Sequence, residues 1–314
     1  MHARSLLLEA PRSLRWVDAD LPAPVPDEAL VRTTAGAISI GSELPFYRGE
    51  ARTFLPPSYP KMTGYENVGR IVEVGANVSG LSTGDRVVAT YGHRTAALIR
   101  ASSAIKIPDE IDDALAILLI PTCDVAKGIA KLRPSAGEPI LVTGGGAIGL
   151  LTIWSLVQQG FGPVDLVEPI ESRRNLALAL GVRHAWRPED APSSPSYPVG
   201  LECSSANAGF GALQRAMRLN GRICVLADGL REPLTLSAEF HERELTIVGS
   251  SDGLDYRDHA RWYYPAALHN GANLRRLFDL TVNADDLPAT FTTLSVNPHA
   301  AIKVLVRYRT EPAG

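Results

Sequence analysis

The sequence predicts an α/β protein with two parts, a mostly antiparallel β domain followed by a domain built on a doubly wound parallel sheet. Three observations predict it. Residues 1 to about 108 alternate β-branched and polar positions between glycines and prolines, and from residue 139 short apolar strands alternate with helix-length amphipathic segments. A glycine-rich loop joins the first of those strands to its helix. A length of 314 residues also suits about two domains.

The first part begins with a strand, because the apolar run near the N-terminus is only three leucines long and too short for a signal peptide. Further strands are expected at residues 29–33, 69–75 and 85–90. Helices are expected at 112–119 and 124–132, where the pattern changes. These segments predict that the first part is mostly antiparallel β.

The second part alternates strands with helices, which indicates βαβ units on a parallel sheet. Strands are expected at residues 140–143, 164–168, 199–203, 223–226 and 245–248, with helices at 147–158, 172–180 and 209–217. After Asp252 the sequence predicts one more helix, at 256–270, and one last strand, at 302–307.

Composition excludes several classes of protein. Lys and Arg total 31 against 34 Asp and Glu, so no basic field is present to hold a nucleic acid. The cysteines Cys123, Cys203 and Cys224 are too few and too scattered for a disulfide framework, which favours a cytoplasmic protein. Residues 139–157 carry no charge, but three central glycines make a strand, a turn and a buried helix a better interpretation than a membrane span. We therefore expect a small-molecule substrate and neither a nucleic acid nor a membrane as partner.

The glycine-rich loop fits the pattern G-x-G-x-x-G, which is weak alone but follows a predicted strand and opens a predicted helix. Its glycines allow a tight turn, so that backbone N–H groups and the helix N-terminus can approach a pyrophosphate. The second strand ends in Glu168, 24 residues after Gly144, where a carboxylate can accept both hydroxyls of an adenosine ribose. The residues assigned to this cofactor site are Gly144, Gly146, Ala147, Ile148, Gly149, Glu168, Arg173 and Ser204.

The same carboxylate predicts the choice of cofactor. Glu168 would repel a 2′-phosphate, so NAD is expected and NADP is the alternative. Arg173 and Arg174 lie five and six residues further on and could soften this preference. Their alternative role is to form the exposed first turn of the following helix.

Five ordered motifs resemble the medium-chain dehydrogenase/reductase superfamily over essentially the whole chain. They are Gly-Ser-Glu at 41–43, the run from 64 to 75, Gly-Asp-Arg-Val at 84–87, the loop at Gly144 and the segment 168–181. The resemblance implies a GroES-like catalytic domain at 1–121, a Rossmann domain at 122–252 and a return segment at 253–314 that completes the catalytic domain. It also implies that the edge strand around 244–250 pairs two copies into a homodimer.

The resemblance also locates the positions at which zinc-dependent members hold their metal. These positions carry Ile40, Tyr65 and Ile120, and isoleucine offers no lone pair. The cysteine-rich lobe of such members is also absent after Tyr91-Gly92-His93. We therefore expect no zinc and no other metal.

Without a metal, protein donors must meet the substrate oxygen. The resemblance points first to Ser42 and Tyr65, whose alternatives are a strand-end cap and a packed aromatic ring. Glu66 and Glu43 come next in the same region, and Glu66 is expected to hydrogen-bond, with an arginine as its partner. His93 is a candidate proton shuttle or, alternatively, an ordinary hydrogen-bonded side chain.

Three further residues complete the candidate set. Asp124 and Lys127 are three residues apart on a helix that the resemblance places beneath the nicotinamide, and they are otherwise a surface pair. Lys303 matches a basic residue that reaches the cofactor pyrophosphate. Cys203 and Cys224 are expected to pack as small hydrophobes.

The expected function is zinc-independent, NAD-dependent interconversion of a secondary alcohol and a ketone in a biosynthetic pathway. Residues 37–43 and 64–66 resemble the bacteriochlorophyllide hydroxyethyl dehydrogenase branch, which implies a tetrapyrrole substrate, and a biosynthetic alcohol or sugar is the alternative. One alternative is an NADPH-dependent enoyl or quinone reductase. Another is a non-catalytic protein that senses a nucleotide or binds a partner.

Overall fold

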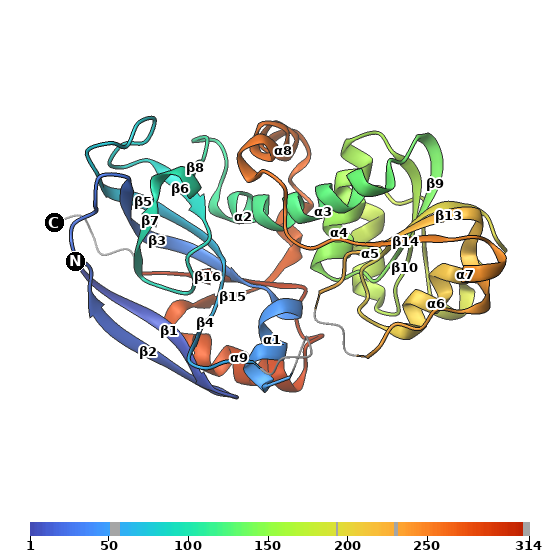
Figure 1. Ribbon diagram of the computed structural model, residues 1–314, viewed down its shortest axis with the longest axis horizontal. Helices are drawn as coiled ribbons and strands as arrows, with labels where there is room; N and C mark the ends of the chain where they lie inside the picture. The colour runs from blue at the N-terminus through green and yellow to red at the C-terminus, as the bar shows by residue number, and fades with distance from the viewer. Residues whose placement is uncertain (51–56, 193, 229–231, 310–314) are drawn as a thin grey trace. The chain divides into compact units, whose positions relative to one another are not determined.

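The computed structural model describes residues 1–50, 57–192, 194–228 and 232–309. The chain divides into two compact units (Figure 1). Unit 1 comprises Met1–Leu119, Ala260–His269 and Phe278–Gly314, and unit 2 comprises Ile120–His259 and Asn270–Leu277. The predicted α/β class is confirmed, with β-rich and parallel-sheet parts in the predicted order along the chain.

Unit 1 contains a seven-stranded sheet of order β15-β16-β3-β5-β6-β8, with β7 paired to β3, and a three-stranded sheet of order β2-β1-β4. Every pair is antiparallel except β15 with β16. The prediction of an antiparallel first part is therefore confirmed. The strands are β1 (His2–Ala10), β2 (Ser13–Asp20), β3 (Glu28–Ile38), β4 (Lys61–Met62), β5 (Glu66–Val74), β6 (Arg86–Ala89), β7 (Ala96–Arg100), β8 (Ile105–Lys106), β15 (Phe278–Asn283) and β16 (Lys303–Arg307).

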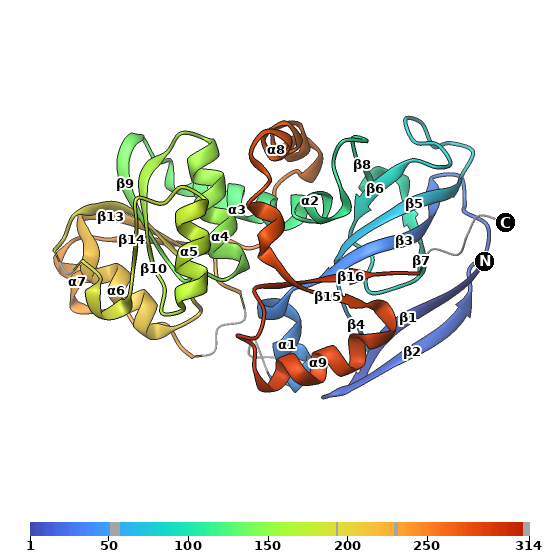
Figure 2. The same cartoon turned by 180° about the vertical axis from the view of Figure 1, so that it is seen from behind.

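Two helices of unit 1, α1 (Ile40–Arg48) and α9 (Leu287–Val296), lie side by side in both ribbon views (Figure 2). The sequence predicted neither. In α9, apolar side chains recur at Leu287, Phe291 and Leu294 and are fully buried in a cluster that also includes β1 residues. Burial of this face stabilises a helix whose threonines and valine have low helix propensity.

The prediction of only one helix and one strand after Asp252 was therefore wrong. Beyond the predicted helix, observed as α8 (Tyr256–Asn270), the chain adds β15 and α9 before it reaches β16. Residues 260–269 of α8 belong to unit 1, whereas the two ends of the helix belong to unit 2.

Unit 2 is built on a six-stranded sheet in which every pair is parallel, with the order β11-β10-β9-β12-β13-β14. The order reverses between β9 and β12, the kind of switch point at which parallel sheets bind ligands beyond the carboxyl ends of their strands. The strands are β9 (Ala136–Thr143), β10 (Gly162–Val167), β11 (His184–Trp186), β12 (Tyr197–Glu202), β13 (Met217–Val225) and β14 (Thr246–Gly249).

The observed bounds of three helices in unit 2 agree closely with the predicted bounds. The predicted bounds 147–158 are those of α4 (Ala147–Gln158), and α5 (Glu171–Ala179) and α6 (Asn207–Ala216) begin and end within two residues of the prediction. The helix α3 (Leu119–Leu132) begins earlier than predicted, and β11 and the short α7 (Ala238–Glu242) were not predicted. Cys203 and Cys224 are buried, as expected of small core residues.

A buried carboxylate anchors the outer half of this sheet. Asp165 of β10 has no exposed surface and accepts hydrogen bonds from the Arg183 guanidinium at 2.5 and 3.1 Å and from Tyr197 Oη at 2.7 Å. It also accepts the backbone N–H of His184 at 3.1 Å. Because these donors favour its ionised form against the effect of burial, the pKa of Asp165 is lowered.

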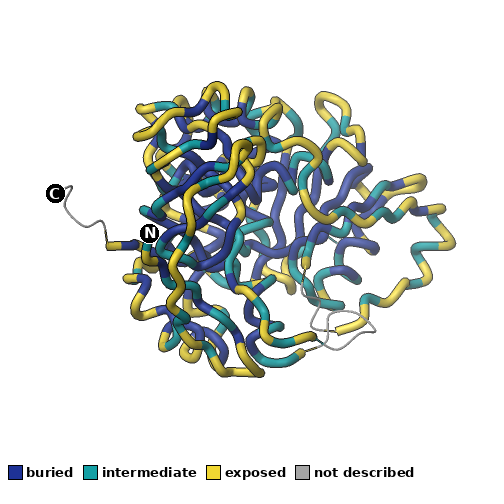
Figure 3. Tube along the Cα trace, turned by 60° about the vertical axis from the view of Figure 1, so that its left-hand side comes forward, coloured by how far each residue is buried: buried dark blue, intermediate teal, exposed yellow. Residues whose placement is uncertain are grey.

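Two features bear on the partners expected from the sequence. The uncharged stretch 139–157 forms the end of β9, the glycine loop and most of α4, and no helix among the described residues is long and apolar enough to span a bilayer. β14 is the last strand in the sheet order, so its outer edge has no neighbouring strand within the described chain. Figure 3 shows that buried residues run through the interior while exposed residues follow many of the outer turns.

Candidate active site and cofactor site

A cluster of hydroxyl groups lies at the start of α1. The phenol of Tyr65, just before β5, donates a hydrogen bond to Ser39 Oγ at 2.7 Å and lies 3.3 Å from Ser42 Oγ. Burial of the phenol, reinforced by the negative charge of Glu66, raises the pKa of Tyr65 far above its ordinary value. Tyr65 is therefore a protonated donor. Ser42 lies in the first turn of α1 and does not cap a strand.

Glu43 positions this cluster. One carboxylate oxygen accepts the backbone N–H of Ser39 at 2.8 Å, and the other accepts that of Gly64, also at 2.8 Å. Gly64 has φ +77°, and a Cβ there would lie 2.8 Å from atoms of His93, so only glycine fits. Glu43 thus fixes the backbone of Ser39 and that of Gly64, the residue before Tyr65.

His93 is buried behind Glu43. Its Nε2 lies 3.2 Å from Glu43 Oε2, a close approach and not an aligned hydrogen bond, and its Nδ1 lies 3.3 Å from Tyr308 Oη. The side chain has no exposed surface. Any proton path through His93 would have to pass through its neighbours, and its role as a proton shuttle stays a prediction.

Glu66 and Lys303 form a buried ion pair. Lys303 Nζ donates to Glu66 Oε1 at 2.7 Å, and both side chains are at most 2% exposed. The expected arginine partner of Glu66 was wrong, since a lysine from β16 takes that place. Contact of Lys303 with a pyrophosphate stays a prediction.

The other two positions that resemble metal-ligand positions carry apolar side chains. Ile40 packs against the apolar cluster that contains α9, and Ile120 is buried in α3. Within residues 1–50, 57–192, 194–228 and 232–309, no three His, Cys, Asp or Glu side chains are grouped as metal ligands would be.

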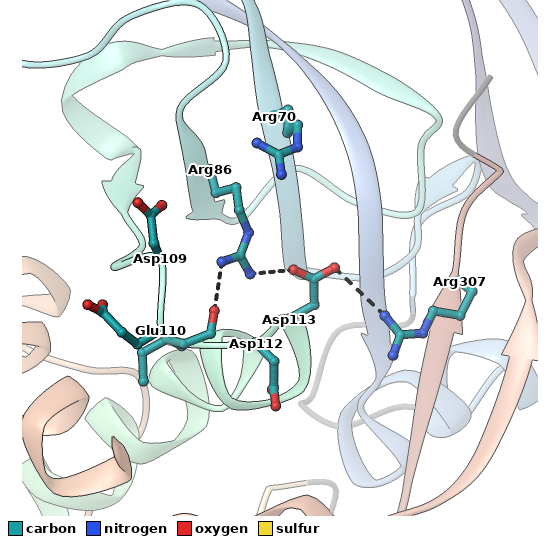
Figure 4. Close-up of a pocket in the computed structure, with 8 residues that line it drawn as sticks. Arg70, Arg86, Asp109, Glu110, Asp112, Asp113 and Arg307 are labelled. Atoms are coloured by element: carbon teal, nitrogen blue, oxygen red, sulfur yellow. Dashed lines mark hydrogen bonds and ion pairs between the residues drawn. The ribbon is translucent and has the colours of Figure 1, made fainter. Parts of the chain in front are cut away.

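Unit 1 also has a polar pocket away from this cluster (Figure 4). Its Arg86 donates to Asp113 at 2.6 Å and to the Ile111 carbonyl at 2.7 Å, and Arg307 lies 3.7 Å from Asp113. The pocket therefore holds both signs of charge, already paired across its wall. It offers no excess positive charge for a phosphate.

In unit 2 the glycine loop follows β9 and has the geometry that the motif predicts. Gly144 has φ +90°, and a Cβ on Gly149 would lie 1.8 Å from the Gly144 carbonyl oxygen. A Cβ on Gly146 would meet only open space. Gly146 precedes α4, so the N–H groups of Ala147 and Ile148 belong to the helix N-terminus, where an anion is favoured.

Glu168 closes the other side of the loop. Its carboxylate accepts the backbone N–H of Gly145 at 2.5 Å and that of Ile170 at 2.8 Å. Each carboxylate oxygen has a second acceptor site, so the ribose hydroxyls that the sequence predicts still have acceptors. The loop and Glu168 together fit a dinucleotide.

The arginines after Glu168 differ from expectation. Arg173 and Arg174 are each 8% exposed, so an exposed first turn is wrong. Arg174 donates to the carbonyl oxygens of Glu168 and Pro169 at 2.8 and 2.6 Å and holds the turn closed. Contact of Arg173 with the cofactor stays a prediction.

Ser204 and the unpredicted Glu202 shape the turn after β12. The Ser204 N–H donates to Glu202 Oε1 at 2.7 Å, and the Ser204 hydroxyl donates to the same oxygen. Glu202 has no exposed surface, and burial raises its pKa. A Cβ on Gly144 would lie 2.6 Å from Ser204 Cα, so this turn abuts the glycine loop. The sequence analysis did not single out Glu202, although a carboxylate near the end of the apolar strand 199–203 could have indicated it.

Asp124 and Lys127 bond to different partners. Asp124 accepts a hydrogen bond from Tyr256 Oη at 2.9 Å, whereas Lys127 donates to the Ser251 carbonyl at 2.8 Å. Burial raises the pKa of Asp124 to about 6. In place of the alternative surface pair, the structure shows two contacts to the segment after β14, and Tyr256 is a partner that the sequence did not reveal. A role of Asp124 and Lys127 at the nicotinamide stays a prediction.

Comparison with known proteins now identifies the family. Residues 25–106 match the model of the alcohol dehydrogenase GroES-like domain. L-threonine 3-dehydrogenase of Pyrococcus furiosus is 30% identical over 278 residues, which cover 74% of this chain and 78% of the relative. The chain belongs to the medium-chain dehydrogenase/reductase superfamily.

Two solved structures have the same fold as this chain. A protein from Sinorhizobium meliloti 1021 bound to NADP has a TM-score of 0.84 and 22% identity, covering 98% of this chain and 99% of its own. An alcohol dehydrogenase of Escherichia coli CFT073 complexed with NADH has a TM-score of 0.82 and 21% identity, covering 98% and 99%. As a member of the superfamily with an intact dinucleotide loop, the chain is an NAD(P)-dependent oxidoreductase.

Proposed function

We propose that the protein is a zinc-independent, NAD-dependent oxidoreductase that interconverts a secondary alcohol and a ketone. The observation that carries the proposal is the protonated phenol of Tyr65, bonded to Ser39 and beside Ser42, at a position where relatives would hold a metal ligand. The dehydrogenases among its relatives support the alcohol–ketone class.

The residues at the three ligand positions do not fit zinc. Ile40 and Ile120 have no donor atom. Tyr65 would have to lose its proton to bind a metal, and burial together with the charge of Glu66 opposes that loss. We derive no step through a metal.

The hydroxyl cluster can instead donate hydrogen bonds to the substrate oxygen, where negative charge develops during hydride transfer. A bound nicotinamide supplies or accepts the hydride. In ketone reduction, the hydroxyl groups of Tyr65, Ser39 and Ser42 donate hydrogen bonds that stabilise the charge developing on the carbonyl oxygen, and the proton that this oxygen takes up comes from water. In alcohol oxidation the hydroxyl groups make the same hydrogen bonds to the alcohol oxygen, and the alcohol proton is released to water. The backbone bonds of Glu43 keep Ser39 and Tyr65 oriented during both.

Glu168 supports NAD over NADP. Its carboxylate is held in place by two backbone N–H groups, so it cannot easily turn away from a 2′-phosphate. The resulting repulsion is worth roughly 1–3 kcal/mol at an effective dielectric constant of about 20.

The substrate class is tested with a panel assayed by absorbance of the reduced nicotinamide. It contains secondary alcohols, sugars, a hydroxyethyl-substituted tetrapyrrole and L-threonine, together with enones, each with NAD and NADP. The proposal predicts turnover of one of the alcohols with NAD. Turnover of enones alone with NADPH would replace it with the reductase alternative.

A further inference from the structure

The helix α3 lies over the carboxyl ends of β13 and β14. A Cβ on Gly128 would lie 2.6 Å from Leu226, the residue that follows β13. Lys131 donates to the carbonyl of Gly249, the last residue of β14, at 2.6 Å, and Lys127 donates to that of Ser251 at 2.8 Å. Asp124 is one turn before Lys127 on the same helix face, so it extends this row beyond the strand ends.

The topology assigns this edge of the sheet to one half of the cofactor. The phosphate loop follows β9, and Glu168, suited to the adenosine ribose, follows β10. In a doubly wound sheet, each half binds one mononucleotide beyond the carboxyl ends of its strands. The half formed by β12, β13 and β14 therefore receives the nicotinamide mononucleotide, at the edge that carries Asp124.

Several polar groups hold the Asp124 carboxylate. Tyr256 Oη donates to it at 2.9 Å and accepts the N–H of Gly253 at 3.0 Å. The charged groups that act on it are Asp252, which raises its pKa, and Lys127, which lowers it, and burial is the largest influence. Tyr256 thus orients an ionisable group at the nicotinamide end of the sheet.

We propose that Asp124, oriented by Tyr256, is a charge that distinguishes the two oxidation states of the nicotinamide. The oxidised ring is a cation and the reduced ring is neutral, so an ionised Asp124 stabilises only the oxidised cofactor. The inference rests on the proposed function only in that the chain binds a nicotinamide dinucleotide. Asp124 acts through the bound ring's charge and takes no proton from the substrate.

The proposal fixes the direction of the pH dependence. With a pKa near 6 in the protein alone, Asp124 ionises as the pH rises, and affinity for NAD⁺ rises with it. By linkage, NAD⁺ binding lowers the pKa of Asp124 and releases a proton near pH 6, whereas NADH binding has no such effect on this group. At an effective dielectric constant of about 20, opposite charges roughly 10 Å apart change the affinity ratio on the order of tenfold.

Calorimetric titration of the full chain with NAD⁺ and NADH, from pH 5.5 to 8 and in two buffers of different ionisation enthalpy, tests this. For the unmodified protein the preference for NAD⁺ over NADH should increase about tenfold across the range, with proton release on NAD⁺ binding only. In Asp124→Asn the affinity ratio should stay at its low-pH value throughout.

Two further variants should shift the pH midpoint of the change in the NAD⁺/NADH affinity ratio, in opposite directions. Tyr256→Phe removes a hydrogen bond that lowers the pKa of Asp124, so the midpoint should rise. Asp252→Asn removes a charge that raises it, so the midpoint should fall, and asparagine tolerates the φ of +52° found at Asp252. A merely structural role for Asp124 would produce neither shift.

Two results would overturn the inference. One is an NAD⁺/NADH affinity ratio that is the same in the unmodified protein and in Asp124→Asn across the pH range. The other is a pH midpoint that neither Tyr256→Phe nor Asp252→Asn moves. If both cofactor forms still bind in that case, the proposed function stands without it. Failure of both NAD⁺ and NADH to bind the unmodified protein would overturn both.

Discussion

The two candidate sites of the chain are built in different ways. In unit 2 the cofactor loop takes its shape from the backbone, because Gly144 needs its positive φ and Gly149 has no room for a Cβ. In unit 1 the hydroxyl cluster takes its shape from side chains, since Glu43 must reach the N–H groups of both Ser39 and Gly64. A site shaped by the backbone should therefore be less sensitive to changes in nearby side chains than a site shaped by side-chain hydrogen bonds.

The largest effect is expected at Tyr65. Tyr65→Phe removes a hydrogen-bond donor, and loss of one donor to a developing oxyanion lowers kcat on the order of 10²–10³-fold. NADH affinity should be unchanged, because the glycine loop belongs to unit 2. Steady-state kinetics and NADH titration measure the two.

Matched variants sharpen this result. Tyr59→Phe removes a phenol that bonds only to the Phe46 carbonyl in the described contacts, and it should leave kcat near that of the unmodified protein. Ser42→Ala should lower kcat less than Tyr65→Phe does, because Tyr65 keeps its 2.7 Å bond to Ser39. Near-normal kcat in both Tyr65→Phe and Ser42→Ala would refute the role of the cluster.

The scaffold of unit 2 is tested at Asp165. Asp165→Asn weakens the bonds to Arg183 and Tyr197 and should lower the free energy of unfolding by about 2 kcal/mol, a value reduced because Arg183 is 46% exposed. NADH affinity should not change, since the loop geometry is set elsewhere. Chemical denaturation at pH 7 gives the first quantity, with the exposed Asp190→Asn as control.

The same carboxylate predicts a pH dependence. Because the pKa of Asp165 is lower in the folded protein than in the unfolded chain, its stabilisation is present above about pH 4 and is lost as the pH falls through the folded value. The difference in stability between the unmodified protein and Asp165→Asn should therefore shrink in acid. A difference that stays constant from pH 7 down to pH 3 would show that the Asp165 charge contributes nothing.

A smaller effect is expected at Glu168. The unmodified protein should bind NADH at least about tenfold tighter than NADPH, and Glu168→Ser should bring the two affinities closer. The ratio is the useful quantity, because the variant also loses the bonds to Gly145 and Ile170 and weakens both complexes. Tighter binding of NADPH by the unmodified protein would favour the enoyl or quinone reductase.

The last prediction concerns the self-association of two copies of the chain. β14 is an edge strand with partly buried Ile247 and Val248, and exposed edges pair readily. Light scattering at micromolar concentration should give about twice 33.7 kDa. A mass near 33.7 kDa would leave the edge unpaired and the homodimer prediction wrong.

The difference between the two regions also explains what the sequence could predict. The glycine spacing and the bounds of α4 depend on residues close in the chain, so local pattern sufficed. The contacts of Asp124 with Tyr256 and of Glu66 with Lys303 join residues 132 and 237 positions apart. The identity of such partners depends on tertiary packing that no local pattern records.

The same limit applies to burial. Arginine side chains are usually exposed and histidine side chains are intermediate in burial, so the residue types of Arg173 and His93 gave no sign that the fold covers them. The helix α1 was missed for a related reason: its Gly41 and Pro45 oppose a helix locally, while burial of Leu44 and Tyr47 stabilises it.

The central claim is that hydroxyl groups do in this protein what a metal does in its zinc-dependent relatives. The most direct measurement is turnover, on a substrate found in the panel, of protein purified without added zinc, with its metal content determined on the same sample and after treatment with a chelator. The account predicts well under one equivalent of zinc per chain and unchanged kcat after chelation. One tightly held zinc per chain whose removal abolishes turnover would contradict it.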